Sequence, residues 1–155
     1  MINHPIEPVY NQDSKILILG SFPSVKSRAA KFFYHHPQNR FWKVLAAIFK
    51  EEVPQTIDEK KQFLLRNHIA LWDVIASCDI KGSSDSSIEN VKVNDLDLIM
   101  QHCPIEKIIT NGNTAYRYYQ RYFHYLQPVY KLPSTSPANA AYSLDKLISI
   151  WKDCF

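Results

Sequence analysis

Short apolar runs alternate with amphipathic stretches along most of the chain. Four apolar-rich runs, at 15–19, 69–75, 107–110 and 130–132, are short and end at Gly, Pro or polar residues, which is typical of strands. The run from Lys15 to Leu19 shows no alternation of apolar and polar residues. We therefore expect that strand to be buried on both faces, as in a parallel sheet.

The segments between these runs have the periodicity of helices, with apolar residues three or four positions apart. The expected helices cover 39–49, 56–67, 95–102, 114–123 and 143–152. The second begins with Thr-Ile-Asp-Glu, which has the form of a capping box. Strands that alternate with helices predict an α/β fold, here a three-layer α/β/α sandwich around a short, mainly parallel four-stranded sheet. At this length we expect one domain, residues 1–155.

Two loops follow predicted strands and are candidates for a functional site. Residues 20–38 follow the first strand, and residues 133–141 follow the last. Ligands of parallel sheets bind beyond the carboxyl ends of the strands, so both loops are expected at that edge. Residues 77–94, which contain the polar run SSDSS, are also expected to form a loop.

The loop 20–38 interleaves three kinds of side chain that suit a nucleic acid. It reads GSFPSVKSRAAKFFYHHPQ and holds hydroxyls, cations and aromatic rings. Hydroxyls and cations contact phosphates, and aromatic rings stack on bases that have left the helix. The alternative is that the aromatic rings fill the core. The Ser- and Pro-rich loop 133–141 either grips a phosphate or the minor groove, or simply connects a strand to a helix.

Composition excludes several other classes of protein. The chain has 155 residues, 46% of them hydrophobic and 21% charged, and only three glycines. It contains no Walker loop, no dinucleotide fingerprint and no GxSxG elbow. The three cysteines, Cys78, Cys103 and Cys154, are far apart and too few for a four-thiolate cluster. The adjacent His35 and His36 would point to opposite sides of an extended chain, so we expect no metal and no cofactor.

Charge and the first residues constrain the partners and the location. The net charge of +3 is compatible with an anionic partner but does not require one. The first fifteen residues lack the apolar core of a signal peptide, and no apolar stretch reaches the length of a membrane span. We therefore expect a cytoplasmic monomer without a membrane partner.

Three motifs carry a resemblance to the uracil-DNA glycosylase superfamily. The segment HPQNRFWKVL, 36–45, is similar to the HPxNxFWKV segment of mismatch-specific uracil glycosylases, and 18–49 resembles the first catalytic region of the superfamily. The loop 133–140 resembles the second motif, and 108–119 resembles the penultimate strand and helix. The resemblance implies an α/β fold and action on DNA.

The sequence also departs from the usual superfamily pattern. In the pentad GSFPS, 20–24, Phe22 occupies the position at which the superfamily usually has Asn or Asp to position the attacking water. The second motif lacks the histidine of the classical uracil enzymes. The combination of GSFPS, HPQNRFW and LPSTSPAN resembles the hypoxanthine-DNA glycosylase branch, also called DNA-deoxyinosine glycosylases.

This resemblance implies roles for individual residues. Asn39 corresponds to the catalytic asparagine and would position water through its amide oxygen; it could also be the N-cap of the helix that follows. Tyr34 would stack on the flipped base. The base pocket is expected to comprise Gly20, Ser21, Phe22, Pro23 and Tyr34. DNA contacts are expected from Ser24, Lys26, Ser27, Arg40, Ser134, Thr135, Ser136, Pro137 and Asn139.

The implied activity is that of a monofunctional DNA glycosylase in base excision repair. Its partner is DNA that contains a deaminated base, most favourably hypoxanthine in deoxyinosine, and water attacks C1′ after base flipping. Uracil or mismatch activity within the same superfamily remains an alternative. Three others are a lyase that uses Lys26 or Lys31 as a Schiff-base nucleophile, an inactive DNA-binding module, and a relative that acts on a free nucleoside or small ligand.

Overall fold

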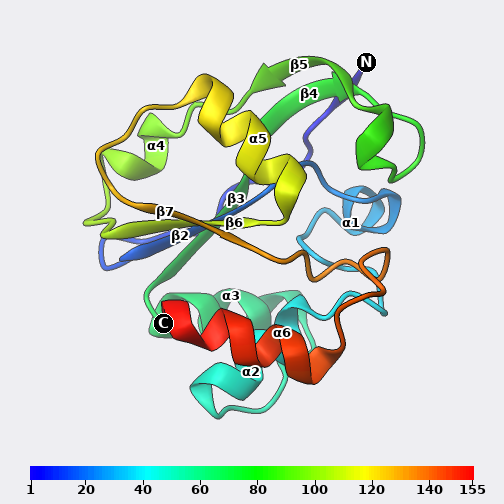
Figure 1. Ribbon diagram of the computed structural model, residues 1–155. Coiled ribbons are helices and arrows are strands. Elements are labelled where there is room, and N and C mark those ends of the chain that lie inside the picture. Colours follow the sequence, from blue (N-terminus) through cyan, green and yellow to red (C-terminus); the bar gives the residue numbers. More distant parts are fainter.

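The computed structural model describes residues 1–155 and has a four-stranded sheet at its centre (Figure 1). The strands are β2 (Ile16–Gly20), β3 (Ile69–Asp73), β6 (Lys107–Asn111) and β7 (Val129–Leu132). Their order is β3-β2-β6-β7, and every neighbouring pair is parallel. The predicted parallel sheet is confirmed.

The helices lie on both faces of this sheet (Figure 1). One face carries α2 (Phe41–Phe49), α3 (Ile57–Arg66) and α6 (Leu144–Trp151), and the other carries α4 (Asp97–Met100) and α5 (Asn113–Tyr122). The predicted three-layer α/β/α arrangement is therefore confirmed. The side chain of Thr56 accepts a hydrogen bond of 3.0 Å from the N–H group of Glu59, as the capping box predicts.

A second, antiparallel sheet was not expected from the sequence. It comprises β1 (Ile2–Asn3), β4 (Ile75–Asp79) and β5 (Glu89–Val93), in the order β1-β4-β5. The prediction of a loop over 77–94 is wrong for its two ends, which pair as a hairpin around a short 3₁₀ helix, η1 (Asp85–Ser87). β5 is largely exposed and reads ENVKV, so its apolar signal is weak.

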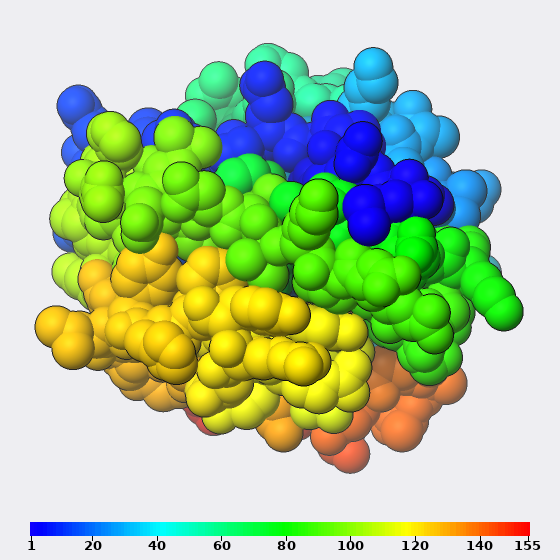
Figure 2. Space-filling view, turned by 90° about the horizontal axis from the view of Figure 1, so that it is seen from above, coloured from blue at the N-terminus to red at the C-terminus, as the bar shows by residue number.

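Two further short elements complete the chain. The helix α1 (Val25–Ala30) forms inside the predicted loop 20–38, with the hydroxyl of Ser24 accepting from the N–H group of Ser27 at its start. A 3₁₀ turn, η2 (Lys152–Cys154), ends the chain. Seen from above, α5, the β4–β5 hairpin and the N-terminal residues lie at the surface of the molecule (Figure 2).

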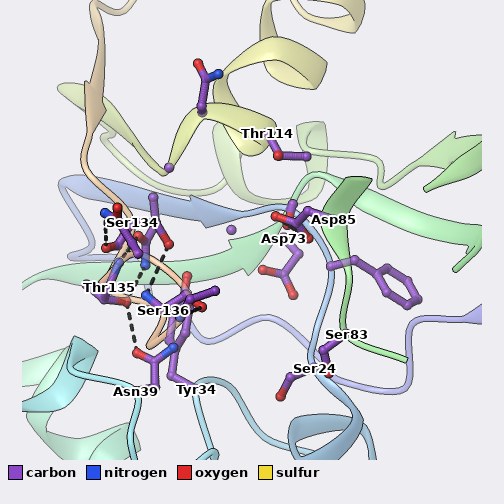
Figure 3. Close-up of a pocket in the computed structure, with 18 of the residues that line it drawn as sticks. Ser24, Tyr34, Asn39, Asp73, Ser83, Asp85, Thr114, Ser134, Thr135 and Ser136 are labelled. Atoms are coloured by element: carbon purple, nitrogen blue, oxygen red, sulfur yellow. Dashed lines mark hydrogen bonds between the residues drawn. The ribbon is translucent and has the colours of Figure 1, made fainter. Parts of the chain in front are cut away.

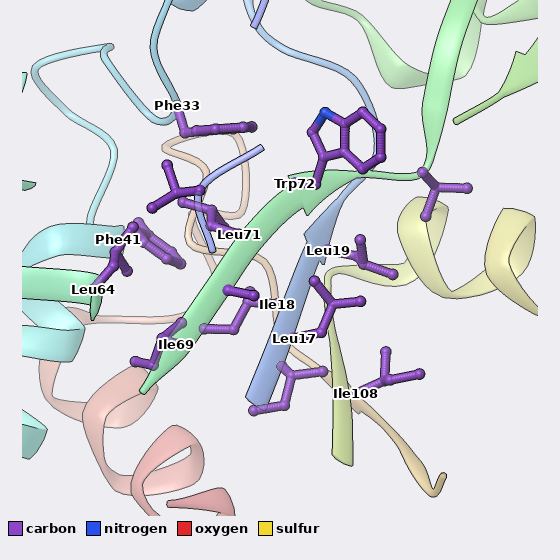
Figure 4. Close-up of a cluster of buried hydrophobic side chains, with 14 of the residues drawn as sticks. Leu17, Ile18, Leu19, Phe33, Phe41, Leu64, Ile69, Leu71, Trp72 and Ile108 are labelled. Atoms are coloured by element: carbon purple, nitrogen blue, oxygen red, sulfur yellow. The ribbon is translucent and has the colours of Figure 1, made fainter. Parts of the chain in front are cut away.

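The core lies between the central sheet and its helices. A cluster of 34 buried hydrophobic residues includes β2, of which Leu17, Ile18 and Leu19 have no exposed surface (Figure 4). Such continuous burial explains why β2 shows no alternation, because a parallel strand covered by helices has apolar neighbours on both faces. None of the helices has the length and hydrophobicity to cross a bilayer.

Candidate active site

A pocket of about 760 Å³ opens at the carboxyl ends of the central strands. β2 and β6 are adjacent there, and the connections from them lead to opposite sides of the sheet, which is where parallel sheets usually bind ligands. The walls come from the loops that follow β2, β6 and β7 and from the η1 turn. Both loops that the sequence singled out thus border one cavity.

All five residues expected in the base pocket line this cavity: Gly20, Ser21, Phe22, Pro23 and Tyr34. Gly20 allows two polar side chains to approach the strand end. A Cβ atom at this position would lie 2.3 Å from Oδ1 of Asp73 and 2.8 Å from the hydroxyl of Tyr34. A larger residue would push these groups away from the pocket floor.

Asn39 is held by a chain of hydrogen bonds that starts at the end of β6. Oδ1 of Asn111 accepts from the backbone N–H of Thr135 at 3.0 Å, so the amide nitrogen of Asn111 must be the group that donates to the Thr135 hydroxyl, also at 3.0 Å. That hydroxyl therefore uses its own proton to donate to Oδ1 of Asn39 at 2.9 Å (Figure 3). The backbone thus determines the orientation of both amides.

This arrangement leaves the nitrogen of Asn39, rather than its oxygen, free for a ligand. Oδ1 of Asn39 also accepts from the N–H group of Phe41 at 2.9 Å, so both of its lone pairs are used. Nδ2 donates to no protein group, and the residue lines the pocket. In this geometry the amide oxygen has no free acceptor site for water, contrary to the expectation from the sequence. The N-cap expectation is wrong by one position: Arg40 is the N-cap of α2, and Asn39 precedes it and accepts from the N–H group of Phe41.

Thr135 was expected to contact DNA, but it lies in the interior. It has no exposed surface, and both its hydroxyl and its N–H group are bound to the two asparagines. A contact with DNA would require these bonds to break. Thr135 is instead a positioning residue that connects Asn111 to Asn39.

The Thr135→Val variant is expected to reduce the free energy of unfolding by about 1–3 kcal/mol, because it leaves the Asn111 amide and the Asn39 carbonyl without their common partner. Urea unfolding measures the change. Thr135→Ser keeps the hydroxyl and is the matched control, with a smaller expected loss. If the valine variant were as stable as the serine variant, the hydrogen-bond chain would not contribute to the free energy of unfolding.

Arg40 was also expected to contact DNA, and the structure gives its guanidinium a different task. The group donates to the backbone carbonyls of Thr135 (3.3 Å), Ser136 (2.7 Å) and Asn139 (3.1 Å), and to that of Tyr142. These four acceptors span the loop after β7. Arg40 is absent from the pocket lining and acts as an internal clamp on that loop.

The remaining residues that were expected to bind DNA fall into two groups. Ser24, Ser134, Ser136 and Asn139 line the pocket, whereas Lys26 and Pro137 lie outside its lining. Ser27 lines it too, but it is only 2% exposed, and its hydroxyl accepts from the N–H group of His35 and from Ser24. The prediction of a phosphate contact at Ser27 is therefore wrong, since its hydroxyl is used in the fold.

Tyr34 reaches the pocket floor with an unpartnered hydroxyl. Its ring stacks on Phe41 with centroids 4.1 Å apart, which leaves only the opposite face for a base. The backbone is left-handed, with φ of 49°, so the local strain is offset by tertiary contacts. Burial and, secondarily, the charge of Asp73 raise the pKa of the phenol, which therefore remains a donor.

Two carboxylates in the pocket wall were missed by the sequence reasoning. Asp73 ends β3 beside Gly20, and its Oδ2 accepts from Nε2 of His4 at 2.7 Å. Nδ1 of His4 accepts from the N–H group of Ile6, which places the imidazole proton on Nε2. A polar residue at a strand end is the signal that could have identified Asp73. No pattern distinguished Asp85 from its solvated neighbours in SSDSS.

Asp85 reaches into the pocket from η1. Its carboxylate accepts from the Ser21 hydroxyl at 3.2 and 3.3 Å. Asp85 is an exposed residue, but partial desolvation of its carboxylate in the pocket raises its pKa, and the charge of Asp73 acts in the same direction, whereas the hydroxyls of Ser21 and Thr114 and the charge of Arg117 favour ionisation. The pocket therefore combines an asparagine amide, a phenol and two carboxylates.

Comparison with known proteins places this geometry in a family. A model of the uracil DNA glycosylase superfamily matches residues 7–154. The chain belongs to the uracil DNA glycosylase superfamily. The resemblance inferred from the sequence motifs is thereby confirmed.

Individual relatives support the same assignment. A hypoxanthine DNA glycosylase from Methanosarcina acetivorans is 34% identical over 100% of this chain and 99% of its own length. A protein of the same name from Methanosarcina barkeri is 32% identical over 72% of each chain. The solution NMR structure of a uracil DNA glycosylase candidate from Methanosarcina acetivorans is similar with a TM-score of 0.83 and 29% identity, covering 99% of this chain and 98% of that one.

Within this superfamily member, Phe22 is a packing residue at the position where the usual motif has a polar one. It is 8% exposed, and its ring meets that of His4 edge-on at 5.9 Å. His4 in turn contacts Asp73, so Phe22 supports the N-terminal segment beneath the pocket. The carboxylate that stands beside Gly20 comes from the neighbouring strand.

Proposed function

We propose that the protein is a monofunctional DNA glycosylase that removes deaminated bases, with hypoxanthine in deoxyinosine as its preferred target, in base excision repair. The observation that carries the proposal is the Asn39 amide, which hydrogen bonds hold in place in the lining of the pocket of a superfamily member. The names of the relatives favour hypoxanthine over uracil as the base.

The pocket suits a nucleotide that has left the double helix. Its volume of about 760 Å³ lies in the range of small-molecule sites, and most of the residues that line it have polar side chains. Unstacking a base costs a few kcal/mol, and a mispaired base costs less to extrude. This difference favours deaminated bases before any contact with the base edge is made.

Water attack at C1′ assigns a role to the free nitrogen of Asn39. In the proposed reaction the bond between C1′ and the base breaks first, and the sugar becomes an oxocarbenium ion. Nδ2 of Asn39 donates to the oxygen of a water molecule and holds it on one face of C1′. This hydrogen bond positions the water without activating it, and positioning is enough because an oxocarbenium ion reacts readily with neutral water. The rigid Thr135 and Asn111 partners fix the amide in advance.

Substrate DNA would contact the rim of the pocket. Ser24, Ser134, Ser136 and Asn139 offer hydroxyl and amide groups there, and Lys26 adds an exposed charge nearby in sequence. Lys26 and Lys31, the two lysines of the lyase alternative, lie outside the pocket lining, so the geometry does not support either of them as the nucleophile.

A strand-cleavage assay tests the proposed function. Labelled duplexes that carry deoxyinosine, deoxyuridine or only normal bases are incubated with the protein in EDTA and then heated in alkali. We expect breaks at deoxyinosine that appear only after alkali, because a monofunctional glycosylase leaves an intact abasic strand.

Each other outcome corresponds to a different function. Breaks mainly at deoxyuridine would overturn the preference for hypoxanthine while keeping the glycosylase activity. Breaks without alkali would indicate a lyase, and borohydride trapping would identify its lysine. Absence of breaks with folded protein that binds duplex DNA would favour a binding module.

A further inference from the structure

We propose that Asp85 is the general acid of the base-release step and that it delivers its proton to N7 of the departing purine. The proposal rests on the glycosylase function proposed above and adds a catalytic residue to it. The mechanism built on Asn39 activates neither the base nor its departure, and it leaves both pocket carboxylates without a task.

The position of Asp85 supports this role. It starts η1, and its carboxylate enters the pocket beside Asp73, on the side away from Asn39 and Thr135 (Figure 3). A nucleotide between these walls would present its sugar carbon to Asn39 and its base to Asp85. Ser21, at 3.2 and 3.3 Å, fixes the direction of the carboxylate without burying it completely.

The neighbouring carboxylate supplies the electrostatic reason for a proton on Asp85. Oδ2 of Asp73 contacts Nε2 of His4 at 2.7 Å, and Nδ1 of the same ring accepts from the N–H group of Ile6, so His4 contacts Asp73 rather than Asp85. Asp85 is exposed as a whole residue, but the pocket partly desolvates its carboxyl group, and this desolvation and the charge of Asp73 both raise its pKa. Arg117 on α5 is the charge that opposes this effect. Two carboxyl groups with different environments are a common arrangement for acid catalysis.

The chemical step balances without a cofactor. As the bond between C1′ and N9 breaks, its electron pair passes into the imidazole ring of hypoxanthine. The lone pair on N7 takes the proton of the Asp85 carboxyl, so the base leaves neutral and Asp85 becomes a carboxylate. Water then forms a bond to C1′ and releases one proton, which returns to Asp85 through solvent. The products are hypoxanthine and an abasic sugar.

The test compares deoxyinosine with 7-deaza-deoxyinosine, in which a C–H group replaces N7 and no lone pair is available. Single-turnover rates are measured at saturating enzyme for the wild type, Asp85→Asn and Asp85→Glu. We expect the wild type to be about 100-fold slower or more on the 7-deaza substrate. Asp85→Asn should lose a similar factor on deoxyinosine and lose nothing further on the 7-deaza substrate, while Asp85→Glu should recover part of the rate.

The pH dependence gives an independent readout. The wild-type rate on deoxyinosine should be highest when Asp85 is protonated and should fall as pH rises through its pKa, whereas Asp85→Asn should lack this limb. Asp73→Asn removes a charge that raises the pKa and should move the limb to lower pH. Arg117→Gln removes a charge that lowers it and should move the limb to higher pH. Asp79→Asn, on the same hairpin but outside the pocket, is the matched control and should leave the limb in place.

Several results would overturn the proposal. If Asp85→Asn still slowed further on the 7-deaza substrate, the proton on N7 would come from another group. If only the enzyme concentration at half-saturation changed, Asp85 would bind the base without donating a proton. Release of hypoxanthine by the wild type with no effect of Asp85→Asn would overturn the role of Asp85 alone. Failure of the wild type on deoxyinosine would overturn the proposed function and this inference with it.

Discussion

Asn39→Ala is expected to slow base release about 100- to 1,000-fold in single-turnover experiments, with DNA binding retained. The variant removes Nδ2 of Asn39. This amide nitrogen belongs to a residue that lines the pocket, and it has no acceptor in the protein. A preorganised donor contributes mainly to the transition state, because its position needs no adjustment during the reaction. The rate at saturating enzyme and the affinity for an uncleaved duplex are measured together.

Asn39→Asp distinguishes the two ends of this amide. The aspartate keeps an oxygen for the Thr135 hydroxyl and the Phe41 N–H group, but it replaces the donor Nδ2 by an acceptor. We expect the rate of base release of Asn39→Asp to lie within a factor of about ten of the rate of Asn39→Ala. A variant as active as the wild type would show that an oxygen holds or activates the water, in agreement with the sequence-based expectation.

Arg40→Met is expected to lower the free energy of unfolding by about 3 kcal/mol, since hydrogen bonds to charged groups contribute about 1.5–3 kcal/mol each and the loop carbonyls can be partly rehydrated. The side chain joins the start of α2 to four carbonyls of the loop after β7. Methionine keeps most of the apolar length of the side chain and removes the donors. Urea unfolding and the salt dependence of duplex binding are the two measurements.

Arg66→Met is the matched control for Arg40. Arg66 is on α3 and donates to the carboxylate of Glu51, in a pair whose side chains are 52% and 26% exposed. An exposed pair of this kind contributes about 0–1 kcal/mol, so this variant should remain close to the wild type. If Arg40→Met lost equally little stability and reduced the salt slope by about one, Arg40 would be a phosphate contact after all.

The secondary structure of the central layers followed from local patterns. The apolar runs gave all four strands of the parallel sheet, and the three-to-four-residue periodicity gave α2, α3, α5 and α6 within a few residues. The same reasoning missed β5, whose exposed residues have no apolar alternation strong enough to separate a strand from a loop. It also missed α1, which has only six residues and one buried side chain.

The site was predicted in its location and in part of its membership. The two loops border one pocket because neighbouring parallel strands place their carboxyl ends at the same edge of the sheet. This can be inferred from the sequence once the strands are expected to be parallel. Asp73 could have been found by the same argument, since it directly follows an apolar run. Asp85 could not, because its approach to Ser21 joins residues 64 positions apart through a hairpin that the sequence did not predict.

The sequence by itself determined the α/β fold, the two loops of the pocket and, through its motifs, the superfamily. Only the tertiary structure decided what individual polar groups do there. It turned Arg40 and Thr135 inward, occupied the oxygen of Asn39 and brought Asp73 and Asp85 to one wall. The physical reason is that apolar periodicity reports which face of an element is buried. The partner of a hydrogen-bonding group depends on packing between segments that, as for Asn39 and Thr135, lie 96 residues apart.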